Sequence, residues 1–254
     1  MHNLKIIKGF LPLQEASIED QFNELYIALR LKEERIYSDK EVALLPKVLP
    51  SHRYFKEWNV RRHSLDKLLR YIRMKGHICN ILEIGCGNGW LSAKLAIVAR
   101  GNVTGIDINI VELEQARKVF AKAPNLRFMY GDIRSGMLQD QRYDLIVFAA
   151  SIQYFPSLDE ILKVALNHLT LQGEIHILDS HLYRFNEIAE ARQRSKKYYT
   201  QMGFREMSEY YFHHSIEDLR PFSFFMLHNP HALKNKLTFH KSPFHWVVVK
   251  NSYL

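Results

Sequence analysis

An apolar run that leads into a loop with glycine at every second position is the feature that most constrains this fold. Residues 81–89 read Ile-Leu-Glu-Ile-Gly-Cys-Gly-Asn-Gly, and a helical pattern follows from Trp90 to Ala99. Because glycine has no Cβ, such a loop can turn sharply and bring its backbone close to a ligand. The next helix then directs its free N–H groups and its positive dipole end at that ligand. The pattern is typical of a cofactor site at the carboxyl ends of the strands in a doubly wound α/β sheet.

The glycine spacing distinguishes between cofactors. A dinucleotide site reads G-x-G-x-x-G, and its third glycine allows close packing of helix and strand beside the pyrophosphate. Counted from Gly85, that glycine would be residue 90, which is Trp90. The sequence also contains no G-x-x-x-x-G-K-[ST] phosphate loop. The loop instead has an acid, Glu83, two residues before its first glycine.

On these residues the chain resembles the class I S-adenosylmethionine-dependent methyltransferases, whose first motif is similar to Leu82–Gly89. Further segments similar to the family follow in the family's order: Val103–Asn109 (second strand and its terminal acid), Gly131–Ile133 (loop after the third strand), Tyr143–Phe148 (fourth strand) and Leu171–Glu174 (turn before the fifth). One departure is Glu174, where the family often has a second glycine. The resemblance covers residues 75–180 well and 181–254 loosely, and it is closest to the small-molecule branch that includes quinone-ring methyltransferases.

The resemblance implies a Rossmann-like, doubly wound, seven-stranded α/β sheet whose last strand is antiparallel. Short apolar strands that alternate with amphipathic helices also predict a parallel sheet with right-handed crossovers. We expect strands near 80–84, 103–106, 126–130, 143–149 and 174–179, and helices near 90–99, 111–122, 157–168 and 186–202. Beyond residue 203 the pattern is less regular, with Glu209–Phe212 as the expected sixth strand and His245–Val249 as the seventh.

We expect two structural units, an N-terminal helical cap or arm over residues 1–52 and the methyltransferase domain over 53–254. Within the first unit, Ser38 and Glu41 have the spacing of a helix-capping box. The aromatic-rich segment 213–243 is too long for a tight hairpin, and long connections in compact domains are usually functional or disordered. Its many aromatic residues argue against disorder. We expect it to be an insertion that forms a pocket wall or lid; packing onto the core is the alternative.

The resemblance implies S-adenosylmethionine as the cofactor and assigns roles by position. The backbone N–H groups of Gly85–Gly89 suit the carboxylate of its amino-acid tail, and Glu83 would order that loop. Asp107 would accept hydrogen bonds from both ribose hydroxyls, and Asp132 would accept one from the exocyclic amine of adenine. Ile108 would cover one face of the adenine ring. The expected cofactor-binding residues are Glu83, Gly85, Cys86, Gly87, Asn88, Gly89, Asp107, Ile108, Asp132, Ile133 and Ala149.

Methyl transfer is an in-line displacement, so the enzyme mainly aligns the donor with the acceptor and excludes water. A base is needed only where the acceptor must lose a proton. Candidates are Tyr154, Asp179 and His181, which follow the fourth or fifth strand; each also has an ordinary structural interpretation. The expected acceptor is a small molecule or lipid intermediate of apolar or aromatic character, with or without an anionic group. Arg61 and Arg62 are the expected cationic anchors for such a group. The sequence leaves its identity and the oligomeric state open.

Composition limits the other functions. The formal net charge is +8, and nine basic residues against two acids lie between Lys47 and Gly76. Such a face can attract nucleic acid, so an RNA-modifying methyltransferase remains an alternative, although no nucleic-acid module is present and a solvated helix face is the simpler interpretation. A nicotinamide oxidoreductase is a second alternative, which Trp90 opposes, and a non-catalytic cofactor-binding regulator is a third.

The histidines and cysteines carry no signal for a metal or a disulfide framework. The thirteen histidines do not show metal-ligand spacing, so we predict no metal site. Two cysteines, no signal peptide and no apolar stretch long enough to span a bilayer predict a protein of the reducing cytoplasm.

Overall fold

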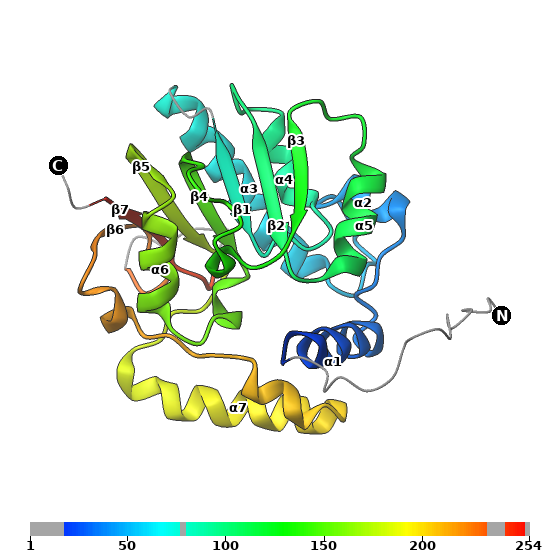
Figure 1. The fold of residues 1–254 in the computed structure, drawn as a ribbon. Coiled ribbons are helices and arrows are strands. Elements are labelled where there is room, and N and C mark those ends of the chain that lie inside the picture. The colour runs from blue at the N-terminus through cyan, green and yellow to red at the C-terminus, as the bar shows by residue number, and fades with distance from the viewer. Residues whose placement is uncertain (1–17, 77–79, 233–241, 252–254) are drawn as a thin grey trace.

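The computed structural model describes residues 18–76, 80–232 and 242–251. At its centre is a seven-stranded sheet with the order β3-β2-β1-β4-β5-β7-β6 (Figure 1). The strands are β1 (Ile81–Ile84), β2 (Val103–Asp107), β3 (Leu126–Tyr130), β4 (Tyr143–Ala149), β5 (Leu169–Leu178), β6 (Ser223–His228) and β7 (Trp246–Lys250). The first five are parallel, and β7 is antiparallel to both of its neighbours. The predicted doubly wound sheet with an antiparallel last strand is therefore confirmed.

Neighbouring residues of the strands face two separate cores. On one face Phe148 of β4 packs with α6 (Leu158–Leu166), and on the other Val147 packs with α3 (Phe55–Lys75) and α4 (Trp90–Ala96). Strands that are covered on both faces need apolar residues at nearly every position. This explains why β1 and β4 are apolar except for Glu83 and Asp144. The connection from β2 to β3 contains α5 (Ile110–Val119).

The first N-terminal helix lies at the carboxyl ends of the strands, and the second packs against α5 (Figure 1). α1 (Ile18–Lys32) lies beside α7 (Ile188–Met202) below the sheet in Figure 1, and the Asn23 side-chain amide donates to the carbonyl of Ile108 at 2.9 Å. α2 (Asp39–Leu44) begins with the predicted capping box of Ser38 and Glu41. Leu45, directly after α2, is buried in the same core as Trp58. The core of the predicted 53–254 unit thus includes a residue of the predicted cap.

The prediction for the sixth strand is wrong. Glu209 ends a short 3₁₀ helix, Arg205–Glu209, and the residues up to Phe212 form a loop. The sixth strand is β6, which pairs with β7 at the edge of the sheet. Its pattern is hard to see in the sequence because the outer face of this edge strand also carries apolar residues, Phe225 and Leu227, which are more than one-third exposed.

The segment 213–243 is therefore not an insertion over residues 223–228, which belong to the sheet. Phe224 and Met226 pack against the core on the α6 side. None of the described residues of this segment lines the cavities of the site, so the expected pocket wall is not found there. Residues 233–241 of the predicted lid lie outside the described residues.

Candidate functional site

The glycine loop after β1 turns back onto the end of β2. Its three glycines have φ of +72°, +51° and +73°, a region that residues with a Cβ rarely adopt. The N–H groups of Gly85 and Cys86 both donate to the carbonyl of Ile106, at 2.9 and 3.1 Å. A Cβ at Gly89 would lie 2.5 Å from the Phe128 ring, so the last glycine allows α4 to pack closely beside β3. The loop is fixed by backbone contacts before any ligand is considered.

Asp107 at the end of β2 holds this loop. Its carboxylate accepts the N–H of Gly87 at 2.7 Å and that of Asn109 at 2.8 Å. Burial raises the pKa of Asp107, while these backbone hydrogen bonds oppose the rise. Asp107 also lines the larger cavity of the site, so it is placed where the predicted ribose contact requires it.

Glu83 is buried beneath the loop, where the Ser92 hydroxyl of α4 donates to it. Burial, together with the charge of Asp107, raises the pKa of Glu83 to about 8. The carboxyl is therefore largely protonated at neutral pH. Its contact with Ser92 ties β1 to α4, which agrees with the predicted role of ordering the loop.

Two adjoining cavities lie at the carboxyl ends of the strands, with volumes of about 420 Å³ and about 110 Å³. Of the predicted cofactor residues, the larger cavity is lined by Gly85, Gly87, Asp107, Ile108, Asp132 and Ile133. The smaller cavity is lined by Glu83, Gly85, Cys86, Gly87, Asn88 and Ala149. Gly89 lines neither and begins α4 instead. The structure thus brings the predicted residues together from four separate strand ends.

Aromatic side chains form one wall of the larger cavity. Phe22 and Tyr26 come from α1, and their rings lie 5.6 and 5.8 Å from the ring of Tyr154. The ring of Tyr210 lies 5.5 Å from that of Phe22. Of these four residues, only Tyr154 was predicted at the site. The spacing of four residues between Phe22 and Tyr26 shows a shared helix face, but it does not show that this face covers the sheet end.

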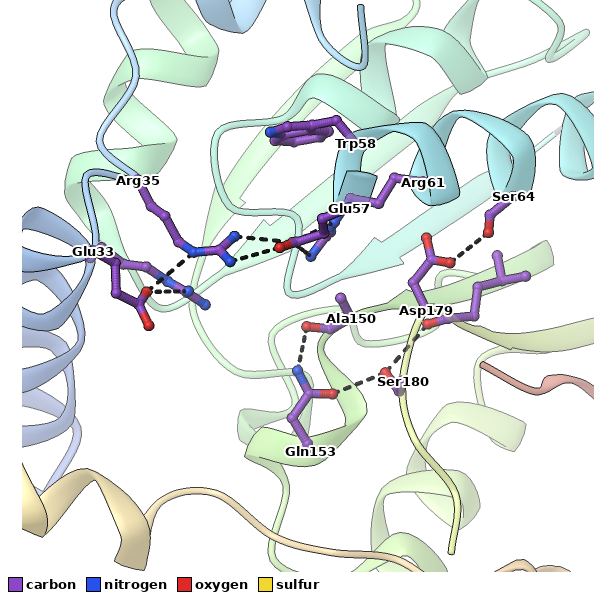
Figure 2. A network of polar contacts seen from close by, with 12 residues as sticks. Glu33, Arg35, Glu57, Trp58, Arg61, Ser64, Ala150, Gln153, Asp179 and Ser180 are labelled. Carbon is purple, nitrogen blue, oxygen red and sulfur yellow. Dashed lines mark hydrogen bonds and ion pairs between the residues drawn. The ribbon is translucent and has the colours of Figure 1, made fainter. Parts of the chain in front are cut away.

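The smaller cavity is polar and contains an ion-pair network. The Arg35 guanidinium donates two hydrogen bonds to the Glu57 carboxylate, at 3.0 and 2.6 Å, and Arg61 donates to the same group at 3.1 Å (Figure 2). Burial alone would raise the pKa of Glu57, but these two arginines lower it to about 2. The lining of the smaller cavity is therefore charged at neutral pH. Arg61 was expected at the site as a cationic anchor, whereas Arg35 and Glu57 were not, because sequence patterns do not show which distant residues pair.

The three candidate bases are not placed together. Tyr154 lines the larger cavity, and its hydroxyl accepts a hydrogen bond from Arg30 at 3.1 Å. Asp179 accepts from the Ser64 hydroxyl at 2.5 Å (Figure 2), and the His181 ring lies 4.7 Å from the Phe244 ring, tilted by 60°. Neither of these two lines either cavity.

Asp132 is placed at the larger cavity as predicted, and it already has a partner. Its carboxylate accepts the backbone N–H of Arg134 at 2.7 Å and is paired with the Arg134 guanidinium at 2.5 Å. Within the described residues there is no cluster of histidine, cysteine or acid side chains that could hold a metal ion. No helix among them is long and apolar enough to cross a membrane.

Comparison with known proteins identifies the fold and the family. The model of a family described as a methyltransferase domain matches residues 76–237, more than half of the chain. The chain belongs to this family of methyltransferase domains. A solved structure of magnesium protoporphyrin IX methyltransferase from Synechocystis, with bound SAH, has a TM-score of 0.57 at 15% identity and covers 92% of this chain and 98% of its own. The resemblance to the class I S-adenosylmethionine-dependent methyltransferases is confirmed.

Curated relatives match over shorter stretches. The malonyl-[acyl-carrier protein] O-methyltransferase of Bacillus cereus is 26% identical over 148 residues, which are 57% of this chain and 54% of that protein. An uncharacterized methyltransferase of Mycobacterium tuberculosis is 34% identical over 112 residues, 44% of this chain and 53% of that protein. The chain thus spans about half the length of these relatives.

Proposed function

We propose that this chain is an enzyme that transfers a methyl group from S-adenosylmethionine to a small-molecule acceptor. The observation that carries the proposal is the pair of cavities that meet at the glycine loop, in a chain of the methyltransferase-domain family. Asp107, Ile108, Asp132 and Ile133 would surround the adenosine in the larger cavity. The loop and the polar cavity would hold the amino-acid end.

Two buried polar atoms support the fit of a polar cofactor. The side-chain oxygen of Asn88 and the side-chain amide nitrogen of Asn109 have no hydrogen-bond partner among the residues that the structure describes, and both residues line the cavities. Buried polar groups are almost always paired, so each of these atoms is a ready partner for a ligand. S-adenosylmethionine supplies a methyl group on a positively charged sulfur, and the residues of this chain align it and exclude water.

The aromatic wall favours an apolar or aromatic acceptor. Tyr154 is the candidate base that the geometry favours, because it is the one of the three that lines a cavity, and Arg30 orients its hydroxyl. α1 would act as a cap that closes the acceptor side, with Phe22 and Tyr26 as its inner face. Acceptors with a carboxyl or hydroxyl oxygen are included, since a relative is an O-methyltransferase. The buried thiol of Cys86 supports a reducing, cytoplasmic setting.

Calorimetry tests the cofactor. We expect S-adenosylmethionine and its demethylated product to bind with micromolar dissociation constants, and NADH to give no heat. Tight binding of NADH, with no response to either methionine cofactor, would support the oxidoreductase alternative instead. A screen with radiolabelled cofactor against fractionated metabolite, lipid and RNA pools then identifies the acceptor class, and labelling confined to RNA would contradict the small-molecule proposal.

A further inference from the structure

A carboxyl group that sequence patterns did not select faces both cavities. Glu112 lies in the first turn of α5 and lines the larger and the smaller cavity. It also lies directly against the glycine loop, since a Cβ on Gly87 would be 3.1 Å from Oε2 of Glu112. A glutamate in the first turn of a helix ordinarily serves the helix itself, as a capping residue or a dipole partner.

That capping role is already filled by other groups. The Asn109 side chain caps α5 by accepting the N–H of Glu112 at 3.1 Å. The N–H of Asn109, which a capping glutamate would accept, is donated to Asp107 instead, at 2.8 Å. The carboxyl of Glu112 has no hydrogen-bond partner among the described residues. Its carboxyl is therefore not used in capping α5 and is available to a ligand in the cavities that it lines.

The groups that face Glu112 come from three parts of the chain. They are Asp107 at the end of β2, Tyr26 and Arg30 of α1, and Cys86 of the loop. Burial, followed by the charge of Asp107, raises the pKa of Glu112 to about 7, and Arg30 opposes this rise. The carboxyl group thus changes charge in the neutral range and gains most from a ligand that donates hydrogen bonds.

We infer that Glu112 is a cofactor-binding residue, whose carboxylate accepts a hydrogen bond from a ribose hydroxyl or the α-ammonium group of the cofactor where the two cavities meet. The inference rests on the proposed function and adds a residue to it. Asp107 already accepts two backbone N–H groups, so Glu112 is the acid here that has its full accepting capacity left. A carboxylate can accept from either the ribose hydroxyl or the ammonium group, and experiment can tell which of the two it binds.

Calorimetric titration of the demethylated product, S-adenosylhomocysteine, into wild type, Glu112→Gln and Glu112→Leu tests the inference. Loss of a charge-assisted hydrogen bond should weaken binding ~10-fold in Glu112→Gln and further in Glu112→Leu. The ratio of wild-type to Glu112→Gln affinity should rise from about pH 6 to about pH 8, because only the ionised carboxylate gives the stronger bond. A purely structural role would not produce this pH-dependent ratio.

Glu114→Gln is the matched control, because Glu114 is exposed on the same helix, and its affinity should equal that of wild type. Methylthioadenosine, which lacks the amino-acid tail, separates the donors: a loss for both ligands assigns the ribose, and a loss for the homocysteine ligand alone assigns the ammonium. Equal affinities and equal pH profiles for wild type and both Glu112 variants would overturn the inference while leaving the proposed function intact. A wild type that binds no S-adenosylhomocysteine at any pH would overturn both.

Discussion

At the scale of single residues, two glycines of one loop should respond differently to the same substitution. Gly87→Ala adds a Cβ that meets only the flexible end of Glu112 at 3.1 Å, whereas Gly89→Ala meets the Phe128 ring at 2.5 Å and the Ala116 Cβ at 2.8 Å. Both residues have positive φ, which costs about 1 kcal/mol for alanine. Gly89→Ala should therefore lower the free energy of unfolding by about 3 kcal/mol, and Gly87→Ala by about 1 kcal/mol.

Cofactor affinity should show the opposite order, because Gly87 lines both cavities and Gly89 lines neither. Urea unfolding measures the first effect, and calorimetry on the folded variants measures the second. If Gly87→Ala bound S-adenosylhomocysteine as tightly as wild type does, the loop would not approach the ligand closely.

The buried Glu83 carboxyl should make stability depend on pH. Burial and Asp107 raise its pKa to about 8 in the folded chain, from 4.5. Between these values the folded state holds a proton that the unfolded state has lost, so Glu83 lowers the free energy of unfolding as pH rises. Glu83→Gln removes this titration, and its stability relative to wild type should increase from about pH 5 to about pH 8. Urea unfolding across this range measures the difference; a constant difference would show that Glu83 is ionised in the folded chain.

At the scale of elements, α1 should be dispensable for holding the cofactor and required for the acceptor. Removal of residues 1–32 deletes α1 but keeps Leu45, which is buried in the sheet core. The glycine loop and Asp107 remain, so S-adenosylhomocysteine affinity should change by less than about tenfold, the effect of one or two lost contacts. Methyl transfer should be lost with the Phe22 and Tyr26 wall. Normal turnover by the truncated chain would contradict the cap proposal, and circular dichroism checks that the sheet is folded.

Which elements could be predicted from the sequence follows from their burial. β1 and β4 are covered on both faces and read as apolar runs, so their predicted bounds nearly match the structure. β6 is an edge strand with apolar residues on its exposed face as well, so its sequence does not show the alternation of apolar and polar residues that predicts a strand. α1 was recognisable as a helix, but its position over the strand ends depends on contacts such as Asn23 with Ile108, which are 85 residues apart.

The residues of the site also fall into those that the sequence predicts and those that it does not. Glycines and acids at strand ends were predicted because parallel strands bring their carboxyl ends to one edge. Asp107 and Asp132 are there for that reason. Arg61 was expected at the site as a cationic anchor. Arg35, the ion pairs of both arginines with Glu57, and the carboxyl of Glu112 were missed, since their roles come from side-chain packing between distant segments. The spacing of residues within one segment does not predict contacts between distant segments.

At the scale of the whole molecule, the site joins segments from Phe22 to Phe212, so ligand binding should stabilise the chain as one unit. The larger cavity is lined by α1, the ends of β1 and β2, the turns after β3 and β4, and the loop after η4 (Arg205–Glu209). A ligand that binds only the folded state at about 100 times its dissociation constant adds about 2.7 kcal/mol to the free energy of unfolding. For a chain of this size, that shifts the melting temperature by about 5–10 °C. S-adenosylhomocysteine should produce this shift in a thermal melt, and Gly87→Ala at the same ligand concentration should show less of it. NADH should leave the melting temperature unchanged, and a shift with NADH equal to that with S-adenosylhomocysteine would contradict the selectivity that the glycine spacing indicates.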